Sequence, residues 1–312
     1  MLVLSHCLMA TIISAAPAQA AAPRVTFERQ AETLVIRVGD QPFARYVTRD
    51  PTIARPFLCD VHGPHGQPVT RPYPPSAPDE ATDHHDMHPG VWLAFGDLSG
   101  HDFWRNRATA RHIDFTAIEP GDGRGQFVSR LEYMADGGKL CDETRTINIA
   151  RREEGYLLSW TSEFRPADQA IHFGDQEEMG FGVRLRSLLT EDKGGRIDNS
   201  EGIEGAKRAW GKTAHWCRYA GQLDDGWTGV VLIADPRNFR ESWFHVRPYG
   251  LLLANVFGRK AFTKGEPSRV TVEPSETLVL RYGLFVFDGQ PAPVDGQMAY
   301  RQYLLANSLS EP

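Results

Sequence analysis

The feature that most constrains the fold is an almost unbroken succession of strand-like runs. Short runs rich in β-branched and aromatic residues follow one another from residue 33 to residue 287, and segments rich in Gly and Asp separate them. Tight antiparallel turns require such residues, as in the connections at 119–125, 135–139 and 224–227. Since no helical stripe alternates with the strands, the pattern predicts all-β, mostly antiparallel sheets packed face to face.

The run at 180–189 illustrates the expected alternation of side chains. Phe181, Val183 and Leu185 occupy one set of alternating positions, while Arg184 and Arg186 occupy the other. Because successive strand residues point to opposite faces, this run predicts a strand with one apolar face and one basic face.

Two segments depart from the strand pattern. Residues 294–308 form the only credible long helix, which we interpret as a terminal cap. Residues 60–90 contain repeated prolines that forbid a helix or an interior strand, and a loop of this length usually has a function. No repeat or linker divides the chain, so residues 23–312 are expected to form a single domain.

Residues 1–22 have the character of a cleavable export signal. They carry no Lys, Arg, Asp or Glu and end in a run of small residues. Their apolar stretch is too short and interrupted to span a bilayer, which predicts no transmembrane anchor after cleavage. We therefore expect a periplasmic or secreted protein.

Charge and cysteine content exclude some classes of function. The formal net charge is -6, which argues against nucleic acid as a partner because phosphate binding needs a basic surface. Cys59, Cys141 and Cys217 are the cysteines outside the signal, and they are too few and too widely spaced for a disulfide framework. At most one bridge could form, and the sequence does not say whether any of the three pair.

The histidine-rich segment at the end of the proline-rich loop is the first candidate site. His84 and His88 have the spacing of zinc ligands on a helix, but Pro89 places them in a loop. Three interpretations remain open: a divalent metal bound by His84, His85 and His88, imidazoles that act as acid or base, or solvated loop histidines.

Two further clusters carry polar or aromatic groups. Glu178 comes just before the strand that carries Arg184 on its basic face. The two residues are six positions apart, so their side chains would point to the same polar face if the strand begins at Glu178. Trp210, His215 and Trp216 lie close together in a Gly-rich stretch, and aromatic rings beside polar groups suit sugars, although core tryptophans are equally common.

Several stretches together resemble the bacterial DUF6807 family, long catalogued under a methane-oxygenase (PmoA) name. They are residues 84–104, 180–187, 199–221, 235–239, 242–266 and 280–287. The methane-oxygenase name does not suit the chain, because a membrane oxygenase subunit needs several apolar spans of about 20 residues. The resemblance implies an antiparallel β-supersandwich similar to galactose mutarotase, with carbohydrate bound on a concave sheet face.

The leading hypothesis is an exported carbohydrate-active protein that acts on a sugar or other small molecule. His85 is the expected proton shuttle, with Glu178 and His84 as catalytic partners. The residues expected to bind substrate are Arg184, His88, Trp210, His215, Trp216 and Asn255. Epimerisation, elimination and glycoside cleavage stay open. The alternatives are a non-catalytic glycan-binding module and a metal-dependent enzyme built on the histidine loop.

Overall fold

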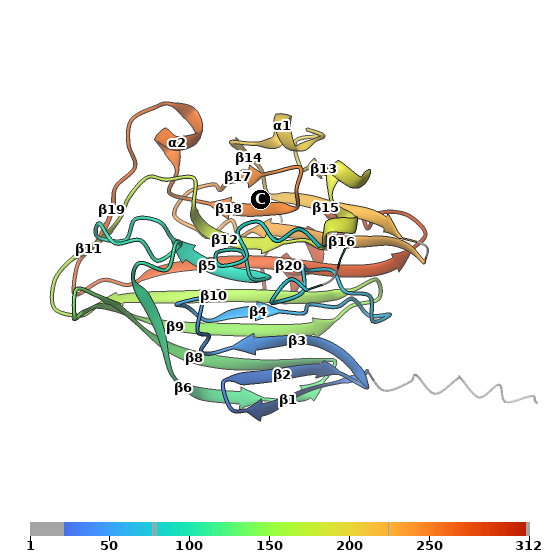
Figure 1. Cartoon of the computed structure of the whole chain (residues 1–312), viewed down its shortest axis with the longest axis horizontal. Coiled ribbons are helices and arrows are strands. Elements are labelled where there is room, and N and C mark those ends of the chain that lie inside the picture. Colours follow the sequence, from blue (N-terminus) through green and yellow to red (C-terminus); the bar gives the residue numbers. More distant parts are fainter. Residues whose placement is uncertain (1–21, 77, 79, 224, 310–312) are drawn as a thin grey trace, which may run out of the picture.

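The chain folds into two large antiparallel sheets that pack face to face (Figure 1). The computed structural model describes residues 22–76, 78, 80–223 and 225–309. Within those residues, one sheet has ten strands, in the order β14 (Lys212–Thr213), β17 (Trp243–Val246), β18 (Leu251–Asn255), β12 (Met179–Arg184), β5 (Val91–Phe95), β4 (Phe57–Cys59), β3 (Gln41–Val47), β2 (Thr33–Val38), β1 (Arg24–Gln30) and β7 (Gly121–Asp122).

The second sheet has eight strands among the described residues. Their order is β13 (Arg196–Asn199), β15 (Trp216–Leu223), β16 (Gly226–Ala234), β20 (Leu278–Gln290), β10 (Tyr156–Pro166), β9 (Gly138–Arg151), β8 (Arg124–Ala135) and β6 (Thr109–Glu119). A small separate sheet pairs β11 (Ile171–Phe173) with β19 (Val270–Val272). The helices are α1 (Ala206–Ala209), α2 (Arg259–Thr263) and α3 (Gly296–Ala306), with short 3-10 turns η1 (Ser187–Leu189) and η2 (Glu191–Lys193).

The predicted all-β antiparallel architecture with a terminal helix is confirmed. Each strand pair in the two large sheets is antiparallel. The hairpin between β8 and β9 turns at Asp136 and Gly137, which both have a positive φ, the geometry that an Asp-Gly pair favours. The main core lies between the sheets and collects inward-facing side chains from both.

Strand alternation also sets what lies outside the sandwich. Phe181 and Val183 of β12 and the following Leu185 belong to the central core, as their positions predicted. The strand ends at Arg184, earlier than predicted, because the chain then turns into η1, and Arg186 therefore lies outside it. On the outer face of the ten-stranded sheet, Trp92 of β5 packs in a separate apolar cluster with side chains from β4 and β18.

The terminal helix covers the outer face of the eight-stranded sheet. Asp295 caps α3 by accepting a hydrogen bond from the backbone N–H of Gln297 at 2.9 Å. Tyr300, Tyr303 and Leu304 of this helix pack in one apolar cluster with side chains from β15, β16 and β20. The predicted cap at 294–308 is therefore confirmed.

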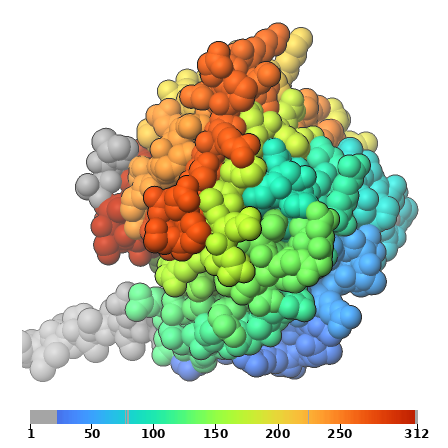
Figure 2. Space-filling view, turned by 90° about the vertical axis from the view of Figure 1, so that its left-hand side faces the viewer, coloured from blue at the N-terminus to red at the C-terminus, as the bar shows by residue number. Residues whose placement is uncertain are grey.

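The two ends of the molecule differ in character. The N-terminal strands β1, β2 and β3 lie at one end, while α1 and α2 lie at the other (Figure 1). The orange segment that contains α2 protrudes from the surface there (Figure 2). Within the described residues, none of the helices has the length and apolar character to cross a bilayer. Residues 1–21 of the predicted export signal lie outside the described part of the chain, so export stays a prediction.

The three cysteines of the described residues are unpaired and buried. Cys59, Cys141 and Cys217 are all free thiols. Burial raises the pKa of each thiol, which keeps it protonated and unreactive at neutral pH.

Candidate functional site

The long proline-rich segment packs against the outer face of the ten-stranded sheet, and one of its own arginines, which is buried, cross-links it. No strand forms between the end of β4 and the start of β5 in the described residues, as the prolines predicted. Arg71 is buried and donates hydrogen bonds to the backbone oxygens of Ala81 (3.0 Å), Asp83 (2.7 Å) and His88 (3.0 Å). The guanidinium of Arg71 thus satisfies backbone carbonyls that would otherwise be paired by a neighbouring strand.

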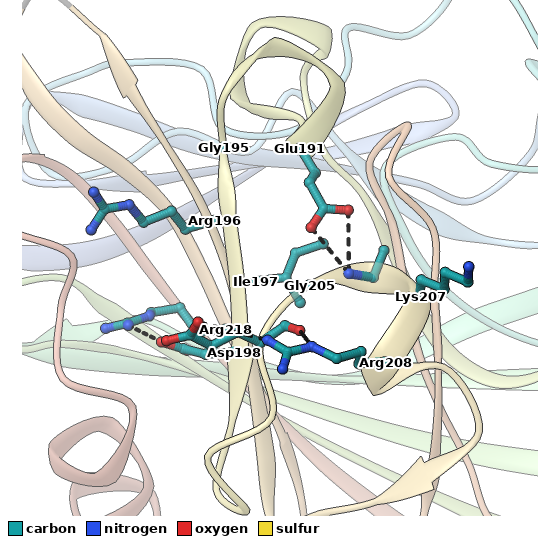
Figure 3. Close-up of a pocket in the computed structure, with 11 residues that line it drawn as sticks. Glu191, Gly195, Arg196, Ile197, Asp198, Gly205, Lys207, Arg208 and Arg218 are labelled. Atoms are coloured by element: carbon teal, nitrogen blue, oxygen red, sulfur yellow. Dashed lines mark hydrogen bonds and ion pairs between the residues drawn. The ribbon is translucent and has the colours of Figure 1, made fainter.

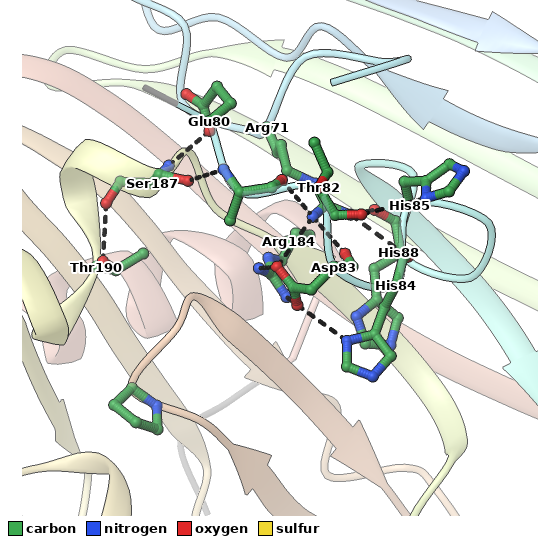
Figure 4. Close-up of polar contacts among 12 residues, drawn as sticks. Arg71, Glu80, Thr82, Asp83, His84, His85, His88, Arg184, Ser187 and Thr190 are labelled. Atoms are coloured by element: carbon green, nitrogen blue, oxygen red, sulfur yellow. Dashed lines mark hydrogen bonds and ion pairs between the residues drawn. The ribbon is translucent and has the colours of Figure 1, made fainter. Parts of the chain in front are cut away.

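Asp83 forms a two-point ion pair with Arg184 at the end of β12 (Figure 4). Arg184 donates to both carboxylate oxygens, at 3.0 and 2.7 Å, and its guanidinium carbon lies 4.5 Å from the ring centroid of Tyr249. Burial raises the pKa of Asp83, but the hydrogen bonds from Arg184 and His84 outweigh burial and hold the pKa below its ordinary value. Asp83 is therefore an anion at neutral pH.

His84 is oriented by this carboxylate. Its Nδ1 lies 2.9 Å from Oδ2 of Asp83, so the neutral ring with a proton on Nδ1 presents an unprotonated Nε2 (Figure 4). No described residue hydrogen-bonds to that Nε2. The backbone of His84 has φ 49°, in the left-handed region that non-glycine residues seldom adopt and that often accompanies functional sites.

His88 lies beneath His84 among aromatic rings. It is 4% exposed, and its ring stacks on Trp92 with centroids 5.1 Å apart and on His84 at the same separation. Burial, reinforced by the charge of Arg184, lowers the pKa of His88 well below its ordinary value. The imidazole is thus neutral, and it serves as part of the pocket floor.

Glu178 contributes a carboxylate to the same hollow. It immediately precedes β12, and its Oε2 lies 3.2 Å from Arg105, which also pairs with Asp102 at 3.1 Å. The predicted neighbour on the strand, Arg184, pairs with Asp83 instead. Glu178 and Arg184 share the outer face of the sheet, but each has a separate partner.

A second acid–imidazole–guanidinium group combines His245 of β17, Arg247 just after that strand and Glu177 from the segment before β12. Arg247 donates from Nε to Nε2 of His245 at 2.9 Å and from Nη2 to Glu177 at 3.1 Å. Burial, with the charge of Arg247, lowers the pKa of His245 to about 4, and burial raises the pKa of Glu177 against the opposing effect of Arg247. His245 is therefore a neutral acceptor at neutral pH.

These groups surround one pocket, hereafter the histidine pocket, with a volume of about 520 Å³. Its volume lies in the range typical of small-molecule sites, and its wall combines aromatic and polar side chains. It is lined by His84, Met87, His88, Trp104, Arg105, Glu178, His245, Arg247, Pro248, Tyr249 and Leu251.

Sequence reasoning missed Arg105, His245, Arg247 and Tyr249. His245 lies on β17 and Arg247 directly follows it in the alternating position, a signal that the strand pattern at 242–247 already contained. Nothing local indicates that this strand pairs with β18 and thereby reaches the outer face beside β12.

Only some of the sequence-predicted residues meet. His84, His88 and Glu178 line the histidine pocket, and Arg184 supports it through Asp83. His85 is exposed, its Nδ1 lies 3.2 Å from the backbone oxygen of Thr82, and it is not among the lining residues. Figure 4 shows its ring pointing away from the Asp83–His84 pair.

Asn255 and Trp210 lie near the pocket without lining it. Asn255 is fully buried, and its Nδ2 donates to the backbone oxygens of Gln176 (2.8 Å) and Glu177 (3.2 Å). It therefore fixes the acidic turn that ends in Glu178. Trp210 lines a neighbouring hollow, which it shares with Arg247.

The expected convergence of His215 and Trp216 with the other groups is wrong. The His215 ring stacks on Tyr300 of α3 with centroids 5.4 Å apart, and the Trp216 indole donates to Gln297 at 3.2 Å. Both side chains thus pack under the terminal helix, on the outer face of the eight-stranded sheet. The alternation of β15 and the position of α3 put them on the opposite side of the sandwich from the pocket.

The histidine loop does not have the arrangement of a metal centre. His84 and His88 stack with their ring planes 28° apart, and His85 is turned away. In the described ranges, no three His, Cys, Asp or Glu side chains come close enough together to hold a metal ion. The residues present therefore do not fit the divalent metal considered from the sequence.

Another hollow, of about 640 Å³, lies between η2, β13 and α1 (Figure 3). Its carboxylates are engaged: Glu191 accepts from the backbone N–H of Ala206 at 3.1 Å, and Asp198 pairs with Arg218. No imidazole lines it. Since it lacks a group that exchanges protons near neutral pH, it is the weaker candidate for chemistry.

Comparisons with solved structures return very distant matches. A TPR-domain containing protein from Parabacteroides distasonis is 10% identical, with a TM-score of 0.46, over 90% of this chain and 49% of that one. The chain thus spans about half the length of that protein. A galactose mutarotase-like protein from Lactobacillus casei is 11% identical, with a TM-score of 0.37, over 84% and 99% of the two chains.

A second galactose mutarotase-like protein, from Clostridium acetobutylicum, is 8% identical, with a TM-score of 0.40, over 86% of this chain and 99% of that one. No curated protein matches the sequence. The model of one protein family matches residues 33–300, which is most of the chain and includes every element that lines the histidine pocket. The chain therefore belongs to DUF6807, a family of unknown function.

Proposed function

We propose that the protein is a carbohydrate-active enzyme that binds a sugar in the histidine pocket and transfers a proton through His84. The observation that carries this proposal is the Asp83–His84 pair, anchored by the buried Arg184 at the wall of a polar pocket. A carboxylate on Nδ1 fixes the tautomer and stabilises the imidazolium that forms when Nε2 accepts a proton.

The rest of the pocket suits a polyhydroxylated ligand. Tyr249 offers apolar ring surface for a sugar face, and Glu178 and Arg105 offer an acceptor and donors for hydroxyl groups. Nε2 of His84 would take the proton from a sugar O–H or C–H group and return it later to carbon or to a leaving oxygen. Epimerisation, elimination and glycoside cleavage all include this step.

The first test compares two adjacent histidines on a panel of glycosides and uronides. We expect His84→Ala to lower kcat by roughly 100-fold or more, because it removes the proton carrier, while His85→Ala keeps the rate within about threefold. Product formation followed by NMR gives both rates. Asp83→Asn should show an intermediate loss with an altered pH profile, because the amide cannot stabilise the imidazolium.

The two variants distinguish His84 from His85, the residue expected from the sequence, as the proton carrier. Loss of turnover in His85→Ala with full activity in His84→Ala would reject His84 as the proton carrier. Sugar binding that survives His84→Ala, with no product from any member of the panel, would instead support the non-catalytic glycan-binding alternative.

A further inference from the structure

A second hollow adjoins the histidine pocket and shares part of its wall. This hollow, hereafter the tryptophan pocket, has a volume of about 300 Å³. Arg247 and Pro248 line both pockets. Each volume lies in the range that a single small ligand fills, so the two together offer room for more than one sugar unit.

Arg247 connects the two pockets physically. Its Nε and Nη2 donate to His245 and Glu177 on the histidine-pocket side, and its guanidinium carbon lies 5.8 Å from the ring centroid of Trp210 on the other side. No described residue accepts a hydrogen bond from its Nη1. Two of its nitrogens are thus held in place by protein partners while a third stays available to a ligand.

The tryptophan pocket also contains a lysine side chain that is available to a ligand. Lys207 of α1 lines it and forms no ion pair with any described residue. The only carboxylate on the wall, that of Glu191, accepts from the backbone N–H of Ala206 at 3.1 and 3.2 Å. Lys207 and Arg247 therefore offer two cationic donors to a ligand in this pocket.

We infer that the ligand is an acidic glycan of at least two units, with one unit in the histidine pocket and a uronic acid unit in the tryptophan pocket. This inference rests on the proposed function, since it extends the same site. The carboxylate of the second unit would face Lys207 and Arg247, because charge-assisted hydrogen bonds to a carboxylate are stronger than those to hydroxyls. The indole of Trp210 would stack on its ring.

The test measures how affinity depends on chain length. Isothermal titration of the full chain would use galacturonic acid, its oligomers of two to four units, and a neutral galactose dimer. We expect Kd to fall about tenfold or more from the monomer to the acidic dimer, and the neutral dimer to bind about as weakly as the monomer. The gain should shrink as salt rises, because exposed charges are screened.

Neighbouring variants on α1 provide a matched comparison. Lys207→Ala should weaken the acidic dimer about tenfold and leave the neutral galactose dimer unchanged, while Arg208→Ala, which removes the same charge outside the tryptophan pocket, should change neither. Trp210→Ala should weaken both dimers, because it removes the ring on which the second unit stacks. A Lys207→Ala effect equal for the acidic and the neutral dimer, or absent for both, overturns the inference, as does failure of every galacturonide to bind.

Measurements of turnover distinguish a failure of the two-pocket binding site from a failure of the proposed catalytic role of His84. If the acidic dimer binds in preference to the monomer and no sugar is converted, the catalytic proposal is wrong and the two-pocket site stands. If single sugars are converted through His84 and bind as tightly as dimers, the two-pocket site is wrong and the catalytic proposal stands.

Discussion

At the scale of single residues, burial divides the histidines of the pocket into two kinds. His84 has a half-exposed side chain and a carboxylate partner. His245 is 3% exposed and accepts a hydrogen bond from Arg247. A proton on His245 would be buried next to a guanidinium, which is unfavourable, and so this imidazole is suited to holding Arg247 rather than to exchanging protons.

This burial predicts a loss of stability in mild acid. The pKa of His245 is about 4 in the folded chain and about 6.5 when unfolded, so the unfolded chain binds more protons between these values. The free energy of unfolding should therefore fall as pH drops from 6.5 to 4, by up to about 3 kcal/mol from this residue. Urea denaturation at several pH values in this range measures the slope.

His245→Asn provides the comparison for that slope. The variant keeps a side-chain hydrogen-bonding group but has nothing to titrate, so its free energy of unfolding should vary less with pH over the same range. Equal slopes in the variant and the unchanged chain would show that His245 does not set the acid sensitivity.

At the scale of elements, buried polar side chains hold the long segment before β5. Asp288 of β20 accepts hydrogen bonds from the backbone N–H groups of His65 (3.0 Å) and Gln67 (2.9 Å). Arg71 binds the backbone oxygens of the histidine loop. The prolines prevent regular structure in this segment, and these side chains make it a rigid part of the pocket.

Removing one such anchor should loosen the loop more than the sheets. Arg71→Met removes the donors to three or more carbonyls, so we expect amide exchange in residues 82–88 to accelerate roughly 30-fold, equivalent to about 2 kcal/mol of lost local stability. Hydrogen–deuterium exchange read by mass spectrometry resolves this segment. Arg37→Met, at an exposed position of β2, is the matched variant and should leave amide exchange in residues 82–88 unchanged. Equal exchange in both variants would contradict the anchoring role.

At the scale of the whole molecule, a buried ion pair within β9 contacts the opposite sheet through Arg145. Arg145 of β9 binds Glu143 through Nε (2.8 Å) and Nη2 (2.9 Å), and it donates to the Tyr46 hydroxyl of β3 at 3.1 Å. Both charged side chains are 0% exposed. Trp160 lies under the guanidinium at 4.6 Å. Arg145 thus links the two sheets through Tyr46, while Glu143 compensates its charge.

Glu143→Gln should be strongly destabilising, since it leaves the Arg145 charge buried without compensation. We expect a loss of about 3–5 kcal/mol in the free energy of unfolding, measured by urea denaturation. Glu163 and Arg165 form an exposed ion pair on β10, the strand next to β9. Glu163→Gln removes the carboxylate of that pair and should lower the free energy of unfolding by less than about 1 kcal/mol. Similar losses in the two variants would rule out a special role for the buried pair.

Much of the fold could be predicted because its signals are local. The runs at 33–38 and 91–95 correspond to β2 and β5 residue for residue, and the run at 156–164 lies within β10. The short strands β4, β7, β11, β13, β14 and β19 were missed, since two to four residues carry too little alternation to distinguish them from a loop. The seven-residue strand β1 was missed as well.

The sequence by itself determined the alternating strands, the turns, the terminal helix and the family, because each depends on neighbouring residues. Only the tertiary structure decided that His84 rather than His85 lines the pocket and that Arg184 pairs with Asp83, 101 positions away. It also decided that Trp216 lies under α3. The physical reason is that a site forms where strand order and loop docking bring distant residues together, and pairing between distant strands leaves no periodic trace in either strand.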